Sequence, residues 1–449
     1  MTRHLQNLLP AIVAAACLLG VTTTLANPSS SPNIIIILTD DMGYGDIGAY
    51  GATRIQTPHI DEMADRGLTL TNGYASANVC TPSRAGLLTG RYPIRSGLAW
   101  KVLEANDSRA LPPSEETIAE LVKRAGYKTG MVGKWHLGGL PKHNPLIHGF
   151  DYFYGVPHSN DMPGFALYEG TREIESPVNQ GLLTQRYTGA ATAFIDEHPD
   201  HPFLLFFAHT FPHIPLYASE AFAGKSAAGV YGDVIEEIDW STGEIVAALK
   251  RNNLLDNTLL IFTSDNGPFF EGSTRGLKGG KGNTWEGGYR VPFIISWPEI
   301  IEAGRVDGTL TANIDLLPTI AEILELQPSA DLVDGSSMLG IFRNETSRPA
   351  RYFYYFNNEA VVGLRDQEWK YLTHTYYTGS IGAFEKFDQL PGFNASYDLL
   401  FDARGEDGEA YSVADRHPDV LLRMQGELAS SRKEFDKLRT RPAETTYPR

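Results

Sequence analysis

A cysteine precedes an arginine by one helical turn in the segment Cys80-Thr81-Pro82-Ser83-Arg84. Pro82 suits the first turn of a helix, which predicts that Cys80 lies at or near the N-cap. Backbone N–H groups and the positive end of the helix dipole favour an anionic group there. Arg84 can lie on the same side of the helix as Cys80. The segment predicts either a reactive site for an anion or a helix start with a buried cysteine.

Two pairs of hard oxygen ligands follow two apolar runs. The pairs are Asp40 with Asp41 and Asp265 with Asn266. Adjacent carboxylates repel one another unless a cation lies between them, and such oxygen ligands suit Ca²⁺ or Mg²⁺ and not zinc. Asp-Asn-Gly is also a turn signal by itself, so either pair alone is compatible with a simple turn. Together they predict one divalent cation, with Ca²⁺ expected and Mg²⁺ as the alternative.

Basic side chains follow two further apolar runs. Lys134 and His136 come after one of them, and His209 and His213 after the other. In an open parallel sheet, ligands bind beyond the carboxyl ends of the strands. We therefore expect all these polar groups at one edge of one sheet. Lone histidines are usually structural, and that reading, or a place in the substrate pocket, is expected for His143, His148, His158 and His209.

The elements that would position these groups alternate along the chain. Short apolar runs with β-branched residues are typical of buried strands, and they occupy residues 34–38, 129–132, 203–208, 259–263 and 291–296. Helices are expected between them, over 57–67, from Ser114 to Gly126, and over 233–250 and 316–326. The alternation predicts an α/β fold with a large, mostly parallel sheet covered by helices on both faces.

The alternation of expected strands and helices ends at about residue 348. Strands are expected at 352–356, 361–364 and 369–372, and a last helix over 417–438. We therefore predict a catalytic α/β domain over residues 30–350 and a small α+β subdomain over 351–449.

The N-terminus has the pattern of an export signal. Arg3 begins a short polar start, an apolar stretch covers residues 8–21, and Ala26 ends a small-residue cleavage site. The apolar stretch is short for a transmembrane helix. We expect a signal peptide over 1–26, an exported periplasmic or secreted protein, and no membrane attachment after cleavage. An uncleaved anchor and a lipid anchor on Cys17 are the alternatives.

Charge and cysteine content exclude some partners and cross-links. The formal net charge of −16 gives no electrostatic footprint for nucleic acid, so nucleic acid is not an expected partner. Any positive charge that an anionic substrate needs must be local. After cleavage of the signal only Cys80 remains, so the mature chain can form no internal disulfide.

The Cys80–Arg84 segment resembles the sulfatase signature Cys-X-Pro-Ser-Arg, which directs oxidation of the cysteine to formylglycine. The resemblance continues in the same order through residues 133–138, 155–161, 212–213, 265–267, 279–288 and 397–399. It is closest to the arylsulfatase A-like branch of the alkaline phosphatase superfold, and it covers nearly the whole mature chain.

This resemblance implies hydrolysis of sulfate monoesters, in which a hydroxyl of the hydrated formylglycine attacks sulfur. Residue 80 would join the four oxygen ligands at the metal. Arg84, Lys134 and Lys281 would hold hydrate and sulfate oxygens, and Ser159 would lie near the sulfate. His213 would protonate the leaving oxygen, and His136 would take a proton from the remaining hydroxyl.

The resemblance also implies the partners, which are a sulfated saccharide or small molecule and a maturation enzyme that generates formylglycine. A carbohydrate sulfate is expected, with aryl sulfates as surrogates. Aromatic residues near the motifs could stack on a sugar ring or belong to the core, namely Tyr217, Phe269, Phe270 and Trp285. Two alternatives remain: a phosphodiesterase or phosphonate monoester hydrolase of the same superfold, and a binding protein that keeps only the fold.

Overall fold

The computed structural model describes residues 31–139, 141–329, 332–345, 350–374, 397–404 and 408–441. The expected signal peptide, with Cys17, lies outside the described residues. Within those ranges, no helix is long and apolar enough to cross a membrane.

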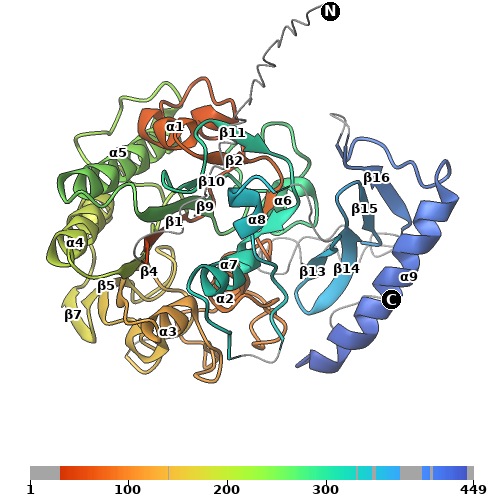
Figure 1. The fold of residues 1–449 in the computed structure, drawn as a ribbon, viewed down its shortest axis with the longest axis horizontal. Helices are drawn as coiled ribbons and strands as arrows, with labels where there is room; N and C mark the ends of the chain where they lie inside the picture. The colour runs from red at the N-terminus through yellow and green to blue at the C-terminus, as the bar shows by residue number, and fades with distance from the viewer. Residues whose placement is uncertain are drawn as a thin grey trace, which may run out of the picture.

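A ten-stranded sheet forms the centre of the larger part of the molecule (Figure 1), with the strand order β11-β2-β10-β9-β1-β8-β4-β5-β6-β7. The strands from β9 to β5 in this order run parallel. They are β1 (Asn33–Thr39), β4 (Lys128–Lys134), β5 (Tyr152–Val156), β8 (Phe203–Ala208) and β9 (Thr258–Ser264). The expected α/β fold with a mostly parallel sheet is confirmed.

Shorter strands extend this sheet at both edges. They are β2 (Leu68–Leu70), β10 (Phe293–Ser296) and β11 (Arg305–Asp307) on one side, and β6 (Leu167–Glu169) and β7 (Arg172–Glu175) on the other. β10 pairs antiparallel with β9. It begins at Phe293 and not at the expected residue 291, because Pro292 has no N–H to donate to a ladder. A separate pair joins β3 (Gly73–Tyr74) to β12 (Thr311–Ala312).

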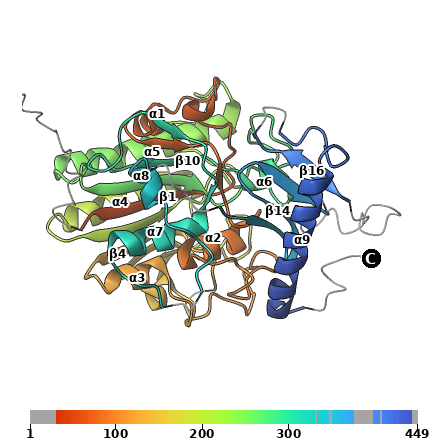
Figure 2. The same cartoon turned by 45° about the vertical axis from the view of Figure 1, so that its right-hand side comes forward.

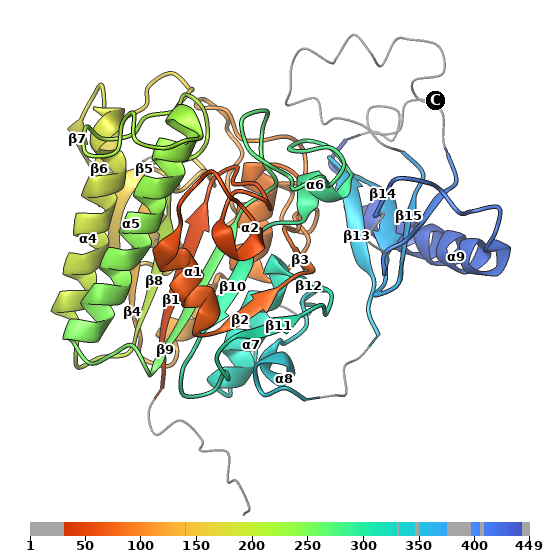
Figure 3. The same ribbon diagram turned by 90° about the horizontal axis from the view of Figure 1, so that it is seen from above.

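β1 pairs with a strand on each side and is covered on both faces of the sheet, because its side chains are apolar toward both faces. Ile34, Ile36 and Leu38 pack into one core, while Ile35 and Ile37 pack into the other. The first core contains α2 (Cys80–Thr89), α3 (Ile118–Lys123), α7 (Leu316–Ile323) and α8 (Leu339–Phe342). The second contains α1 (Pro58–Asp65), α4 (Leu183–Glu197) and α5 (Gly229–Arg251), which Figure 3 shows side by side on one face.

Some helix ends differ from the prediction. The helix expected from Ser114 begins at Ile118, because Thr117 is its N-cap and forms a capping box with Glu120. α5 begins at Gly229 and not at residue 233, and α7 ends at Ile323 and not at residue 326.

A second, antiparallel sheet lies beside the first (Figures 1 and 2). Its strands are β13 (Phe353–Asn357), β14 (Ala360–Arg365), β15 (Trp369–Leu372) and β16 (Leu399–Asp402), and α9 (Pro418–Phe435) packs against it. A third core joins this sheet to Tyr74, Tyr92 and Tyr289 of the larger part, near the short helix α6 (Glu286–Tyr289). The expected small C-terminal unit of strands and one helix is therefore present, packed directly on the larger part.

Candidate active site

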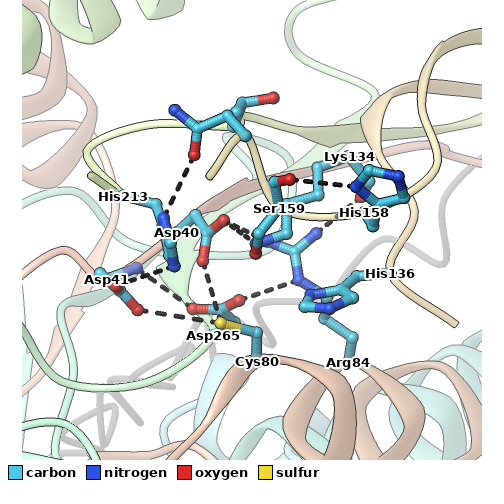
Figure 4. Close-up of polar contacts among 12 residues, drawn as sticks. Asp40, Asp41, Cys80, Arg84, Lys134, His136, His158, Ser159, His213 and Asp265 are labelled. Carbon is cyan, nitrogen blue, oxygen red and sulfur yellow. Dashed lines mark hydrogen bonds and ion pairs between the residues drawn. The ribbon is translucent and has the colours of Figure 1, made fainter. Parts of the chain in front are cut away.

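The carboxyl ends of β1 and β9 bring the predicted metal ligands together. Asp40 and Asp41 follow β1, and Asp265 follows β9, which pairs with β1 along its whole length. One ligand atom from each of these three carboxylates and from Cys80 lies within 4.8 Å of the others, and all four residues are buried (Figure 4). Residues separated by more than 200 positions in the sequence thus form one cluster.

The cluster fits a hard divalent cation. Burial and the neighbouring Asp40 raise the pKa of Asp265 to about 7, so an added cation would favour its ionised form. Asn266 donates its Nδ2 to Asp41 Oδ1 at 2.7 Å, and its own Oδ1 is buried with no hydrogen-bond partner among the described residues. Carboxylate oxygens around an unsatisfied amide oxygen are the ligand set that Ca²⁺ or Mg²⁺ prefers.

Cys80 is the first residue of α2 and is 1% exposed, with Val79 as the N-cap. The prediction of a place at or near the N-cap is therefore confirmed. Sγ lies 3.3 Å from Asp40 Oδ1. Burial, reinforced by Asp40, raises the pKa of the Cys80 thiol well above its usual range. An unmodified thiol here stays protonated and is a poor nucleophile, because the thiolate is the reactive form.

Three cations balance the three carboxylates, and two of them, Arg84 and Lys134, are fully buried. Arg84 Nε lies 2.8 Å from Asp265 Oδ2, the Lys134 ammonium pairs with Asp40, and Lys281 Nζ lies 2.7 Å from Asp41 Oδ2. The side-chain charges of the cluster therefore sum to zero before any metal binds. A divalent cation would give the site a net charge of about +2, which suits an anionic ester in a water-poor environment.

His136 and His213 use different ring nitrogens for structural hydrogen bonds. His136 Nε2 contacts Leu103 O at 2.9 Å, and its Nδ1 is buried with no partner in the described part of the chain. His213 Nδ1 contacts Ile214 O at 2.6 Å. Because a carbonyl only accepts, the proton lies on Nε2 of His136 and on Nδ1 of His213. Nδ1 of His136 and Nε2 of His213 are therefore the nitrogens left for proton transfer.

Burial dominates the titration of both rings. Together with Lys134 and Arg84 it lowers the pKa of His136 well below its usual range, so this ring is neutral at pH 7 and can accept a proton. Burial and Lys281 also lower the pKa of His213, whose Nε2 lies 3.8 Å from Asp41 Oδ2. His209 is fully buried and has no hydrogen-bond partner within the described ranges, in line with the structural reading.

Two site residues have a left-handed backbone that the sequence did not predict. Asp41 has φ 68° and His136 has φ 58°. This conformation costs roughly 1–2 kcal/mol for a residue with a Cβ. Asp and His adopt it more often than most residues with a side chain, but nothing in the sequence distinguishes these two from the other Asp and His residues of the chain. Strain of this kind is concentrated at functional sites.

The cluster opens into a pocket of about 260 Å³. Its inner wall contains most of the predicted site residues, namely Asp41, Cys80, His136, Ser159, His213 and Lys281. Arg84 and Lys134 are fully buried and lie behind this wall, where Lys134 Nζ donates to Ser159 Oγ at 2.6 Å.

The outer part of the pocket contains groups that sequence reasoning missed. Glu104 and Asp161 are exposed carboxylates at its mouth, and nothing in the sequence distinguishes them from other loop charges. Of the four aromatic residues considered for sugar stacking, Phe269 lines the pocket. Trp285 instead packs on Phe401, with Lys278 Nζ 3.8 Å from the centre of its ring.

Comparison with known families agrees with the motifs. Residues 32–326 match the family model described as Sulfatase, and residues 280–391 match the model described as N-sulphoglucosamine sulphohydrolase, C-terminal. The chain is 35% identical to steryl-sulfatase of Homo sapiens, over 74% of this chain and 73% of the relative. It is 37% identical to N-acetylgalactosamine-6-sulfatase of Sus scrofa, over 86% and 79%, and 34% identical to arylsulfatase A of Bos taurus, over 92% and 90%.

Solved structures share the whole architecture. A chain described with the metabolism of multiple glycosaminoglycans by Bacteroides thetaiotaomicron superposes with a TM-score of 0.80 at 30% identity, covering 90% of this chain and 100% of that chain. The phosphonate monoester hydrolase of Agrobacterium radiobacter has a TM-score of 0.64 at 19% identity, covering 90% of this chain and 96% of that chain, and so shows the shared fold alone. With the family model covering residues 32–326 and these relatives aligned over most of their length, the chain belongs to the sulfatase family.

Proposed function

We propose that this sulfatase removes sulfate from carbohydrate esters, with residue 80 oxidised to formylglycine and one Ca²⁺ bound beside it. The observation that carries the proposal is the pocket floor, where Cys80 meets three buried carboxylates and an unsatisfied amide oxygen. Asp40, Asp41, Asp265 and Asn266 would hold the ion. The modified residue and the ion would together supply an oxygen nucleophile, which the protonated thiol of Cys80 cannot provide.

The surrounding side chains divide the remaining work. Lys281, Lys134 and Arg84 neutralise the charge that develops on the sulfate oxygens. His213 would protonate the leaving oxygen from Nε2 in its doubly protonated form, since Nδ1–H stays engaged by Ile214 O and Asp41 Oδ2, 3.8 Å from Nε2, favours the added proton. His136 accepts a proton at Nδ1, since its Nε2 donates to Leu103 O and its lowered pKa keeps the ring neutral.

Mass spectrometry of active protein tests the proposed modification without relying on activity. The peptide that contains residue 80 should be lighter by about 18 Da than the cysteine form, the difference between –CH₂SH and –CHO. Fully active protein with an intact thiol at residue 80 would refute the proposed nucleophile.

The carbohydrate assignment is supported by the mouth of the pocket. Glu104 and Asp161 can accept hydrogen bonds from sugar hydroxyls, and Phe269 offers an aromatic face for a sugar ring. A steroid nucleus would instead place a large apolar surface against these carboxylates. Relatives named as steryl-sulfatase and as N-acetylgalactosamine-6-sulfatase align at similar identity, so sequence identity does not favour either substrate class. The proposal for a carbohydrate therefore rests on the residues of the pocket.

A substrate panel separates the candidates. Sulfated monosaccharides should give a higher kcat/KM than a steroid sulfate, with 4-nitrophenyl sulfate as a common reference. A preference for the steroid would remove the carbohydrate assignment. Faster hydrolysis of 4-nitrophenyl phosphate esters than of the sulfate would favour the phosphodiesterase or phosphonate hydrolase alternative.

We also propose that the chain is exported after cleavage of residues 1–26, and that a catalytic domain over 30–350 precedes a C-terminal subdomain over 351–449. N-terminal sequencing of protein recovered from the periplasm or the medium tests the cleavage. Recovery of the protein only from the cytoplasm would contradict export.

A further inference from the structure

A second buried cluster of charges lies where the C-terminal sheet meets α6. Its acidic members are Glu286, the first residue of α6, and Glu409, and its basic members are Arg365 in β14 and Lys370 in β15. These four residues are between 1% and 6% exposed. Charges buried so deeply are costly unless each is paired, which makes their arrangement sensitive to the loss of any one member.

Lys370 and Glu409 connect this cluster to the backbone before α6. Lys370 Nζ lies 2.9 Å from Glu286 Oε1 and 2.6 Å from Glu409 Oε1, and it donates to Thr284 O at 3.0 Å. Glu409 Oε2 accepts the backbone N–H of Glu286 at 2.7 Å. Burial opposes ionisation of Glu286, but Lys370 and Arg365 hold the pKa of this carboxyl below its usual range.

The backbone held in this way belongs to the segment that carries Lys281. Asn78, just before Cys80, holds the same segment from the other side. Its carbonyl accepts Gly282 N–H at 2.9 Å, and its Nδ2 donates to Asn283 O at 2.9 Å. Residues 282–286 are therefore clamped between the chain that leads into α2 and the C-terminal unit. Lys281, whose ammonium reaches Asp41, immediately precedes this clamped stretch.

We propose that Lys370 and Glu409 are positioning residues for Lys281, so that the C-terminal unit completes the sulfatase site without touching the substrate. The inference rests on the proposed function only through the role of Lys281. If the clamp is released at Thr284 and Glu286, the hydrogen bonds from Lys281 N–H to Pro268 O and from Gly282 N–H to Asn78 O still hold the backbone, but the segment on their C-terminal side is free to shift Lys281 relative to Asp41. A displacement of about 1 Å in a catalytic constellation can cost on the order of 100-fold in rate.

A double-mutant cycle tests the coupling. kcat/KM for 4-nitrophenyl sulfate is measured for Lys370→Met and Glu409→Ala, each alone and combined with Lys281→Ala, and normalised to the modified fraction of residue 80. We expect each single change to lower kcat/KM by about 10-fold to 100-fold, and by less than about 3-fold when Lys281 is already absent. Glu409→Gln should lose less activity than Glu409→Ala, because its side-chain oxygen can still accept the Glu286 N–H and Lys370 keeps its ion pair with Glu286.

A matched control separates positioning from general destabilisation. Arg95 also links the C-terminal helix to the larger part of the molecule, with Nη2 2.7 Å from Glu434, but it lies outside the clamp. Arg95→Met should lower the melting temperature without lowering kcat/KM of the folded protein. Should Lys370→Met fail to fold, Thr284→Val removes the hydrogen bond to His374 O without leaving an unpaired charge, and it enters the same cycle.

The outcomes distinguish the two proposals. The positioning role would be overturned if Lys370→Met and Glu409→Ala lowered kcat/KM equally in the presence and absence of Lys281. It would also be overturned if both variants kept full kcat/KM. Either result would leave the proposed function intact. Full activity in Lys281→Ala itself would overturn the role of Lys281 in the proposed function, and the positioning role with it.

Discussion

At the scale of single residues, His136 and His213 show how the backbone selects the reactive nitrogen. Each ring gives one nitrogen to a main-chain carbonyl, Leu103 O for His136 and Ile214 O for His213. The remaining nitrogen is Nδ1 in one ring and Nε2 in the other. Two identical side chains can therefore act as a base and an acid at the same pocket.

The proposed acid role of His213 predicts a dependence on the leaving group. A phenolate of low pKa leaves without a proton, whereas a sugar alkoxide needs one. His213→Ala should therefore lower kcat/KM by about 10²-fold to 10⁴-fold on a sugar sulfate and far less on 4-nitrophenyl sulfate. Equal losses on both substrates would show that His213 does not protonate the leaving oxygen.

Glu104 and Asp161 predict selectivity at the pocket mouth. Removing one hydrogen-bond acceptor for a sugar hydroxyl costs about 0.5–1.5 kcal/mol, or roughly 2-fold to 10-fold in kcat/KM. Glu104→Ala and Asp161→Ala should each show this loss on a sulfated monosaccharide and no loss on 4-nitrophenyl sulfate. If the two variants lose kcat/KM equally on both substrates, these carboxylates do not bind the sugar hydroxyls.

At the scale of elements, close packing of the turn after β9 against the start of α6 shapes the metal cluster. Gly267 follows Asn266, and a Cβ built on Gly267 would lie 1.7 Å from Gly287 O. The turn after β9 can therefore approach the first turn of α6 only where residue 267 has no side chain. This contact connects the carboxylate and amide ligands to the segment that carries Lys281.

Gly267→Ala should therefore abolish most activity and reduce the bound metal, because the turn must move away from residue 287. Gly189, exposed in α4, provides a matched control, since a Cβ there meets nothing within 4 Å. Gly189→Ala should keep full activity and gain about 0.5–1 kcal/mol in the free energy of unfolding. Full metal content in Gly267→Ala, measured by atomic absorption, would contradict the proposed effect of the contact.

The elements also show what sequence patterns can and cannot predict. The apolar runs at 34–38, 203–208 and 259–263 predicted the central strands because strands buried on both faces need such runs. The polar residues after them consequently predicted the cluster at one edge. The left-handed conformations of Asp41 and His136 and the acidic pocket mouth were not predicted, because tertiary packing determines which Asp or His adopts that backbone and which carboxylates line the pocket.

At the scale of the whole molecule, the chain has a net charge of −16, whereas the active site contains three positively charged side chains. Arg84, Lys134 and Lys281 concentrate positive charge where the chain needs it, beside three carboxylates. The expectation that positive charge for an anion must be local is met by these three residues. The cluster also joins β1, β4, β9 and α2, so its occupancy should affect the stability of the whole sheet.

Metal removal should therefore lower both activity and melting temperature. A ligand at about 100 times its Kd stabilises the folded state by about 2.7 kcal/mol, so Ca²⁺ added back to chelated protein should restore a higher melting temperature. Asp41→Ala should lose activity and this shift while remaining folded, whereas the exposed Asp65→Asn should keep both. Unchanged activity and melting temperature after exhaustive chelation, with no metal detectable in the protein, would contradict the metal site.

The central position of β1 also determines when Cys80 can be reached by another enzyme. Cys80 is 1% exposed in the folded chain, but β1 cannot be enclosed until its partner β9, ending at Ser264, has been synthesised. Translation at about 5–20 residues per second leaves on the order of ten to forty seconds between residues 84 and 264. An enzyme that oxidises Cys80 would meet an extended nascent chain in that interval, so the chemistry of residue 80 would be decided before the fold around it exists.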